Sequence, residues 1–245
     1  MIQYWCNHML TPTQILTSHI VANSTMNRSR GLSGVNSYTK DLRFEVLSHL
    51  LERHKANGSV VWYDVCCGEA HALSQAATEL SDRGIRDGVK IIGADLVMSD
   101  PSDQSDQSDQ SNQSNQSNVT LIEGDVSTLL PTQKADLITC VHGLHYIGDK
   151  LGLLTHLSGM LAEGGIFIGN IDPANIRIQG AVSNGWANIA KAAGIHKTHL
   201  VYKDHILKIV QPGRIGFNLV YKGATASEKP NYTGITVMDS WYEMS

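Results

Sequence analysis

The chain has 245 residues with a 42% hydrophobic fraction, which is enough to build one compact domain around a substantial core. Its net charge is −4, and the aspartates of the polar stretch 99–118 account for all of it, so the rest of the chain is neutral. This balance argues against a nucleic-acid partner bound through a basic face, and because no apolar run approaches the roughly 18 residues of a membrane span, no membrane partner is expected either.

The first 36 residues are expected to form an N-terminal arm, ahead of one domain over 37–245. Residues 1–30 lack periodicity and contain no basic segment followed by an apolar one, so we expect no secretory signal. Met26 is an alternative start, and a helix or arm lying over the core is the other interpretation of this segment. From Ser37 onward the apolar residues fall on one face of a helix that ends at Asn57-Gly58.

After Gly58 the chain alternates between strand-like and helical segments. Short apolar runs predict strands at 60–65, 89–94, 119–123, 135–141 and 166–171. Apolar residues at helical spacing predict helices at 71–83, at 151–161 and in a segment that ends at Gly194. This alternation indicates a parallel sheet with helices on both faces.

The end of the chain breaks this alternation. Two strand-like runs, 205–210 and 215–221, are separated by only four residues. Because four residues cannot hold a crossover helix, the two strands must be antiparallel. We therefore predict an α/β fold of three layers, doubly wound, with a mostly parallel seven-stranded sheet that ends in an antiparallel hairpin.

A low-complexity insertion at 99–118 separates the second and third predicted strands. From Ser102 it repeats Ser-Asp-Gln and then Ser-Asn-Gln, and nothing in it can be buried in a core. Such a composition predicts disorder or a solvated loop. Either the array replaces the crossover helix expected here, or a short remnant survives near 95–99.

The most informative segment is Val60–Leu73, which predicts a strand, a tight turn of small residues and a helix. This geometry presents backbone N–H groups and a helix N-terminus to a ligand. The segment resembles motif I of the class I S-adenosylmethionine-dependent methyltransferases. The acid, the frequent cysteine and the central glycine of that motif are present as Asp64, Cys67 and Gly68. Cys66 and Ala70 stand where its first and third glycines usually are.

The same resemblance assigns cofactor-binding residues further along the chain. Asp95, with Leu96 beside it, follows the second strand, where the family's acid binds both ribose hydroxyls of S-adenosylmethionine. A carboxylate suits a diol because it accepts two hydrogen bonds. Asp125 follows the third strand and resembles the residue that binds the adenine amino group, and Val126 would flank the adenine ring.

Two residues near the first helix are further candidates for cofactor binding. Tyr38 resembles an aromatic residue that many family members lay over the cofactor. Arg43, one turn onward, is a candidate partner for the cofactor carboxylate. A packed tyrosine and a solvent-facing arginine are the alternative interpretations.

Histidines follow the fourth strand in the segment His142-Gly-Leu-His145-Tyr146. Histidine suits a general base because its pKa lies near neutrality. We predict that His142 lines the cofactor pocket and that His145 is the catalytic candidate, with packing or hydrogen bonding as the alternative for His145. His71 is expected to face the cofactor tail. The spacing of His142 and His145 fits no zinc pattern, so no metal is assigned.

The resemblance implies a methyltransferase that uses S-adenosylmethionine. The Asn/Asp-Pro-Pro-Tyr/Phe segment of amino-methylating nucleic-acid enzymes is absent after the fourth strand, so we expect a small-molecule acceptor methylated at oxygen or nitrogen, as in natural-product tailoring. A nicotinamide-dependent oxidoreductase is one alternative, which the missing glycines and the predicted C-terminal hairpin disfavour. A non-catalytic S-adenosylmethionine-binding protein is the other. The four cysteines show no CxxC spacing, so a reducing cytoplasm is the expected location.

Overall fold

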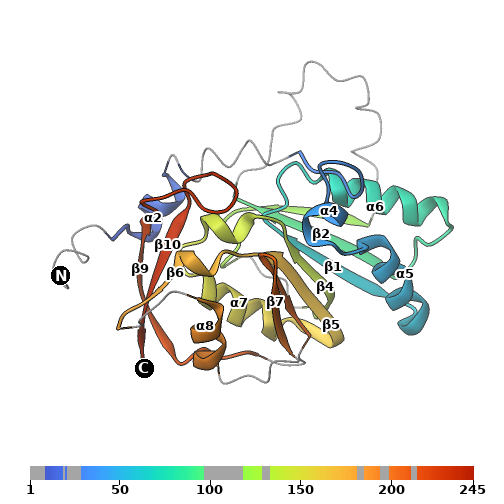
Figure 1. The fold of residues 1–245 in the computed structure, drawn as a ribbon. Helices are drawn as coiled ribbons and strands as arrows, with labels where there is room; N and C mark the ends of the chain where they lie inside the picture. Colours follow the sequence, from blue (N-terminus) through green and yellow to red (C-terminus); the bar gives the residue numbers. More distant parts are fainter. Residues whose placement is uncertain are drawn as a thin grey trace, which may run out of the picture.

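The main element of the fold is a seven-stranded sheet (Figure 1). The computed structural model describes residues 9–18, 20, 29–96, 118–128, 133–180, 185–193, 199–210 and 214–245. The strand order is β3-β2-β1-β4-β5-β8-β7. The strands are β1 (Val60–Val65), β2 (Val89–Asp95), β3 (Val119–Glu123), β4 (Ala135–Cys140), β5 (Leu161–Asn170), β7 (Leu200–Lys203) and β8 (Ile206–Ile209).

The predicted α/β architecture is confirmed. The five strands from β3 to β5 are parallel, whereas β8 runs antiparallel to β5 and β7 antiparallel to β8. The position predicted for the hairpin is wrong: its arms are β7 and β8, and the predicted second arm, 215–221, does not pair with β8. Asp204 and His205 form the connection, both with positive φ (50° and 62°). Such a turn usually signals itself by Asn-Gly or Gly-Gly, which this sequence lacks.

Helices cover both faces of the sheet and complete the three layers. One core cluster joins alternate strand residues such as Val60 and Trp62 to α4 (Tyr38–Leu42), α5 (Val46–Asn57) and α6 (His71–Asp82). The other joins Val61 and Tyr63 to α7 (Lys150–Gly159) and α8 (Trp186–Ala193). The helix predicted from Ser37 to Asn57 is two helices, because Arg43 adopts a left-handed conformation at φ 48° and ends α4.

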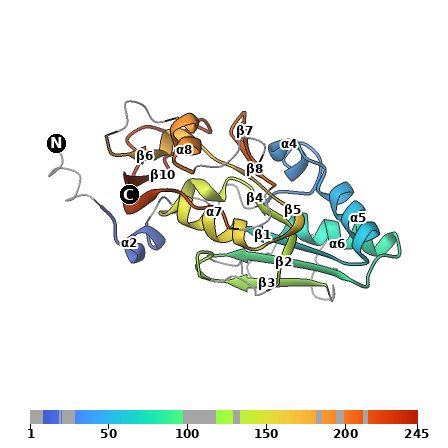
Figure 2. The ribbon, with the colours of Figure 1, turned by 90° about the horizontal axis from the view of Figure 1, so that it is seen from below.

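A second, three-stranded sheet was not predicted. It contains β6 (Ile176–Ile178), which follows the short 3-10 helix η5 (Pro173–Asn175), together with β9 (Leu219–Ala226) and β10 (Met238–Met244). The order is β6-β10-β9. The N-terminal helix α2 (Pro12–Leu16) packs on it through Ile15, and both views place α2 and this sheet at the end of the molecule away from α5 (Figures 1 and 2).

A buried lysine attaches the second sheet to helix α7. The Lys150 ammonium group, at the start of α7, donates hydrogen bonds to the backbone oxygens of Met238 (2.7 Å) and Ile147 (2.9 Å) and to the Ser240 hydroxyl (3.0 Å). Its side chain is fully buried. Because an unpaired buried amine would be costly, the bonds to Met238 and Ser240 hold β10 in place against α7.

Most of the low-complexity insertion lies outside the described residues, as does the expected helix remnant between β2 and β3. The two flanking strands nevertheless pair directly in parallel, from Ile91 opposite Val119 to Asp95 opposite Glu123. Within the described ranges, no helix combines the length and apolar character needed to cross a membrane.

Candidate functional site

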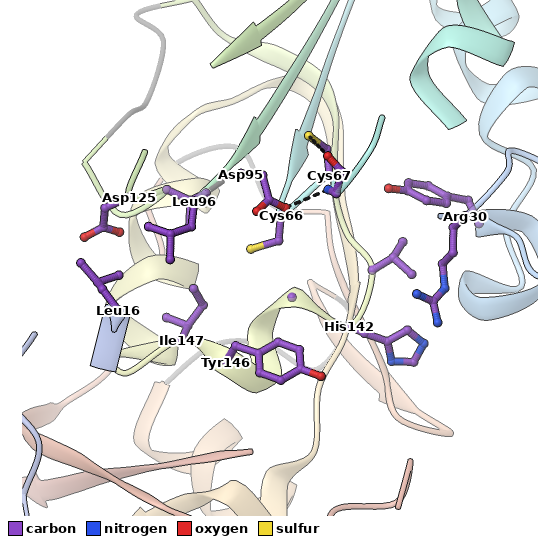
Figure 3. Close-up of a pocket in the computed structure, with 15 residues that line it drawn as sticks. Leu16, Arg30, Cys66, Cys67, Asp95, Leu96, Asp125, His142, Tyr146 and Ile147 are labelled. Atoms are coloured by element: carbon purple, nitrogen blue, oxygen red, sulfur yellow. Dashed lines mark hydrogen bonds between the residues drawn. The ribbon is translucent and has the colours of Figure 1, made fainter. Parts of the chain in front are cut away.

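A pocket opens at the carboxyl ends of β1, β2 and β4. The enclosed part of the pocket has a volume of about 90 Å³, and the pocket opens to solvent. Of the residues predicted to bind the cofactor, all but Arg43 and Asp64 line it: Tyr38, Cys66, Gly68, Asp95, Leu96, Asp125, Val126 and His142. Figure 3 shows Asp125 at one side of the pocket, His142 with Arg30 at the opposite side, and Cys66 between them.

The turn between β1 and α6 keeps a glycine-like backbone although two of its three motif positions are not glycine. Cys66, Gly68 and Ala70 have φ values of 63°, 60° and 58°. The Gly68 N–H donates a hydrogen bond to the Asp95 carboxylate at 2.8 Å, which ties this turn to the end of β2 (Figure 3). A non-glycine residue in the left-handed region carries backbone strain, so Cys66 and Ala70 hold this turn at an energetic cost.

We expect Ala70→Gly to stabilise the protein by about 0.5–1 kcal/mol, because glycine adopts a positive φ without the steric penalty of a Cβ. Thermal unfolding should then show a midpoint raised by about 1–4 °C for a chain of this length. Ala72→Gly, two residues onward inside α6, is the matched control and should destabilise by about 1 kcal/mol. A lower midpoint for Ala70→Gly than for the unchanged protein would contradict the strain assigned to this position.

Asp64 lies beneath the pocket. Its buried carboxylate accepts hydrogen bonds from the Tyr38 hydroxyl (2.6 Å) and the Thr139 hydroxyl (2.5 Å). The Trp62 indole N–H in turn donates to Thr139 at 2.8 Å. Burial raises the pKa of Asp64 to about 7, and burial beside Asp64 raises the pKa of Tyr38 well above its usual range. Asp64 therefore fixes Tyr38, which lines the pocket, against the ends of β1 and β4.

The arginine at the pocket is Arg30, which the sequence did not single out. Arg43 points away and forms an exposed ion pair with Asp204 at 2.5 Å. Arg30 lines the pocket, and its guanidinium Nε donates to the Asp41 carboxylate at 2.6 Å. The backbone brings Arg30 there because the arm folds back on α4: the Tyr38 N–H donates to the Gly31 oxygen at 3.0 Å.

His142 faces the pocket directly after β4, with a left-handed backbone at φ 58°. Its Nε2 atom lies 3.5 Å from the Asp41 carboxylate. Burial alone would raise the pKa of Asp41. Hydrogen bonds from His142 and Arg30 outweigh burial and lower this pKa, so the carboxylate is charged at neutral pH. Arg30, Asp41 and His142 thus form one continuous polar wall.

His145 lies behind that wall and is not among the residues that line the pocket. It belongs to the 3-10 helix η4 (Gly143–Tyr146) and is 1% exposed. Burial lowers the pKa of His145 well below its usual range, so its ring is neutral. Its Nε2 atom lies 3.3 Å from the hydroxyl of Tyr232, a residue of the β9–β10 loop.

Tyr232 connects the histidines of this region, and no local sequence pattern pointed to it. Its hydroxyl lies 3.5 Å from His142 Nδ1 as well as 3.3 Å from His145 Nε2. Its ring stacks on His205, in the β7–β8 turn, with 3.7 Å between the ring centroids. The β9–β10 loop and the β7–β8 turn therefore both contribute side chains behind the end of the pocket at which His142 lies.

The other end of the pocket is mainly apolar. Leu16 from α2 and Ile147 lie near Asp125 and Leu96, and Tyr146 lies between them and His142 (Figure 3). His71 is not in the pocket lining, and its ring instead lies 3.0 Å from the Glu69 carboxylate. Among the described residues, no three or more His, Cys, Asp or Glu side chains gather so that they could hold a metal ion.

Comparison with known proteins adds a family match. Residues 63–167 match the family model described as a methyltransferase domain. No curated protein gives a significant match. Solved structures with similarity include magnesium protoporphyrin IX methyltransferase from Synechocystis PCC 6803, at 18% identity and TM-score 0.44, over 81% of this chain and 94% of that chain.

Two further structures show weaker similarity. An S-adenosylmethionine-dependent methyltransferase from Mesorhizobium loti has 21% identity and TM-score 0.35, over 48% of this chain and 49% of that chain. Coclaurine N-methyltransferase, bound to N-methylheliamine and S-adenosylhomocysteine, has 15% identity and TM-score 0.38. That similarity covers 65% of this chain and 43% of that chain.

Proposed function

We propose that this chain, whose residues 63–167 match a methyltransferase domain, uses S-adenosylmethionine to methylate a small organic acceptor at oxygen or nitrogen. The observation that carries the proposal is the difference between the two ends of one pocket. Asp95 and Asp125 lie toward one end, whereas the other end presents the imidazole of His142 beside the Asp41 carboxylate. One end suits a nucleoside, and the other suits an acceptor that must lose a proton.

The residues present fit the cofactor. Asp95, Asp125 and Val126 line the pocket. In this proposal Asp95 accepts hydrogen bonds from the ribose hydroxyls, and Asp125 and Val126 contact adenine. The left-handed turn at Gly68 allows close approach to the backbone. Arg30, rather than Arg43, is the guanidinium at the pocket wall that suits the cofactor carboxylate. When bound, S-adenosylmethionine supplies an electrophilic methyl group on a sulfonium.

His142 takes the role of proton acceptor in this proposal. Its ring borders the pocket, whereas His145, the base expected from the sequence, is separated from it. The ring takes up the proton when an acceptor hydroxyl or amine loses it. The Asp41 carboxylate, 3.5 Å from Nε2, orients the ring. His145 and Tyr232 support the ring of His142 from behind.

The charge of the pocket lining favours a small acceptor. Arg30 is the one arginine among the described lining residues, and it is paired with Asp41, so this part of the chain offers little basic surface to a nucleic acid. Cys66, Cys67 and Cys140 are free thiols, in keeping with a reducing cytoplasm, and tailoring of natural products is the role we propose.

The two alternative functions, an oxidoreductase and a non-catalytic binding protein, fit the residues of the pocket less well. Cys66 projects its side chain into the lining at the first motif position, where a dinucleotide pyrophosphate needs bare backbone. This disfavours a nicotinamide-dependent oxidoreductase. The His142–Asp41 pair disfavours a purely cofactor-binding protein, because binding alone does not require a base.

A label-transfer experiment tests the proposal. The protein is incubated with S-adenosylmethionine labelled at the methyl group and with an extract of the cells that encode it, and the products are separated by size. We expect label in the small-molecule fraction, and none with Asp95→Ala protein. Label in nucleic acid or protein would overturn the small-acceptor assignment. Calorimetric binding of S-adenosylhomocysteine without any label transfer would indicate a non-catalytic protein, and binding of NAD instead would indicate an oxidoreductase.

A further inference from the structure

Two thiols meet at the floor of the pocket, where the sheet ends. Cys66 follows β1 and is half-buried in the pocket lining, whereas Cys140 is the last residue of β4 and is fully buried. Both side chains face Gly143, the first residue of η4. Gly143 leaves the space for both: a Cβ at that position would lie 2.6 Å from the Cys66 sulfur and 2.9 Å from the Cys140 sulfur.

The strand pairing accounts for this encounter. β1 and β4 are adjacent parallel strands, with Asp64 opposite Thr139, so Cys140 lies opposite Val65 and Cys66 is one residue further along. Strands about 4.8 Å apart with an offset of about 3.3 Å give a Cα separation of about 6 Å, within the range that a disulfide spans. The third thiol nearby, Cys67, has its sulfur turned instead toward Gly93 of β2.

We propose that Cys66 and Cys140 are a reversible disulfide site whose closure weakens cofactor binding. A peroxide enters through the pocket and oxidises the Cys66 thiolate to a sulfenic acid, with the cleaved O–O bond releasing one water. Cys140 then attacks that sulfur, the S–S bond forms and a second water leaves. Two electrons pass from the sulfurs to the peroxide, and small thiols reverse the reaction by exchange.

Closure should alter the pocket because the two free sulfurs must move to a bond of about 2.05 Å. Cys66 lies in the left-handed turn that also holds Gly68 against Asp95. Moving Cys66 toward Cys140 therefore displaces the turn on which the cofactor rests. By linkage, a ligand that favours the open turn must also oppose disulfide formation.

The reaction is expected to be slow at neutral pH. The interaction with the neighbouring Cys140 thiol, followed by burial and the nearby Asp95 and Cys67, raises the pKa of the Cys66 thiol well above its usual range. Only the thiolate reacts, so the rate should increase with pH. An assay at mildly alkaline pH therefore gives a measurable rate while the protein stays folded, which circular dichroism can verify.

The experiment treats the reduced full-length protein with hydrogen peroxide at this pH and maps the products by mass spectrometry. Trypsin places Cys66 on peptide 56–83 and Cys140 on peptide 135–150. We expect these peptides to be joined with the loss of two hydrogen atoms, and dithiothreitol to separate them. Saturating S-adenosylhomocysteine should slow joining by about tenfold or more, and the oxidised protein should bind S-adenosylhomocysteine about tenfold more weakly.

Matched variants make the result specific. Cys66→Ser and Cys140→Ser should each abolish the joined peptides, whereas Cys67→Ser should keep them. Gly143→Ala, which places a methyl group between the sulfurs, should slow joining. Joining through Cys67, or an unchanged rate with saturating S-adenosylhomocysteine, would overturn the proposal. If the reduced protein fails to bind S-adenosylhomocysteine at all, the proposed function fails instead, and the peptide map still reports on the thiol pair.

Discussion

His142→Ala should lower kcat on the acceptor found by label transfer by about 10²–10⁴-fold, the usual range for loss of a general base. Its ring is the imidazole that borders the pocket, and Asp41 lies 3.5 Å from its Nε2 atom. The dissociation constant for S-adenosylhomocysteine should change little, because Asp95 and Asp125, at the ends of β2 and β3, are untouched. Steady-state kinetics and calorimetry separate the two quantities.

Variants of the neighbouring residues give a second measurement of the same role. Asp41→Asn should lower kcat, because Asp41 lies 3.5 Å from His142 Nε2 and orients its ring. His145→Ala should reduce kcat less than His142→Ala, and Tyr232→Phe less again, since both residues act through His142. If His145→Ala has the larger effect, the base is His145, as the sequence alone suggests, and the pocket must open further than this structure shows.

Asp95→Ala should weaken the binding of S-adenosylhomocysteine by about 30–1,000-fold, which corresponds to the loss of about 2–4 kcal/mol from two charge-assisted hydrogen bonds. Its carboxylate also accepts the Gly68 N–H at 2.8 Å, so part of the loss reflects a looser turn. Asp95→Asn retains the shape of the side chain and an acceptor oxygen and should lose less. The measurement is isothermal titration calorimetry, supported by a thermal melt to show that the variant is folded.

Asp82→Ala is the control for this change, because Asp82 is an exposed residue at the end of α6 and its replacement alters the net charge equally. It should leave the affinity unchanged. Equal affinities for the Asp95→Ala and unchanged proteins would refute the assignment of Asp95 to the ribose.

The sequence predicted the part of the fold that strand and helix periodicity encode. The predicted strand at 60–65 coincides with β1, and that at 119–123 coincides with β3. Buried parallel strands are short apolar runs, and the helices between them show a clear apolar face, so each element is visible locally. The motif turn was also predictable, because Asp64 and Gly68 keep their spacing.

The remaining features depend on tertiary contacts that no local pattern reveals. The β7–β8 turn uses Asp204 and His205 at positive φ, so it lacks the usual turn signature. Arg30 reaches the pocket only because the arm folds back on α4, and Tyr232 reaches the histidines only because the second sheet packs beside η4. His142 and His145 could be found from the sequence, but which of them faces the pocket depends on the short helix that follows β4.

The buried ammonium group of Lys150 has a consequence for how the protein unfolds. Detaching β10 would leave that buried group without two of its three hydrogen-bond acceptors. Such an intermediate is costly, so the two sheets should lose their structure together in a single cooperative transition. The appended sheet, and with it the loop that carries Tyr232, thus shares the global stability of the molecule and does not open as an independent flap.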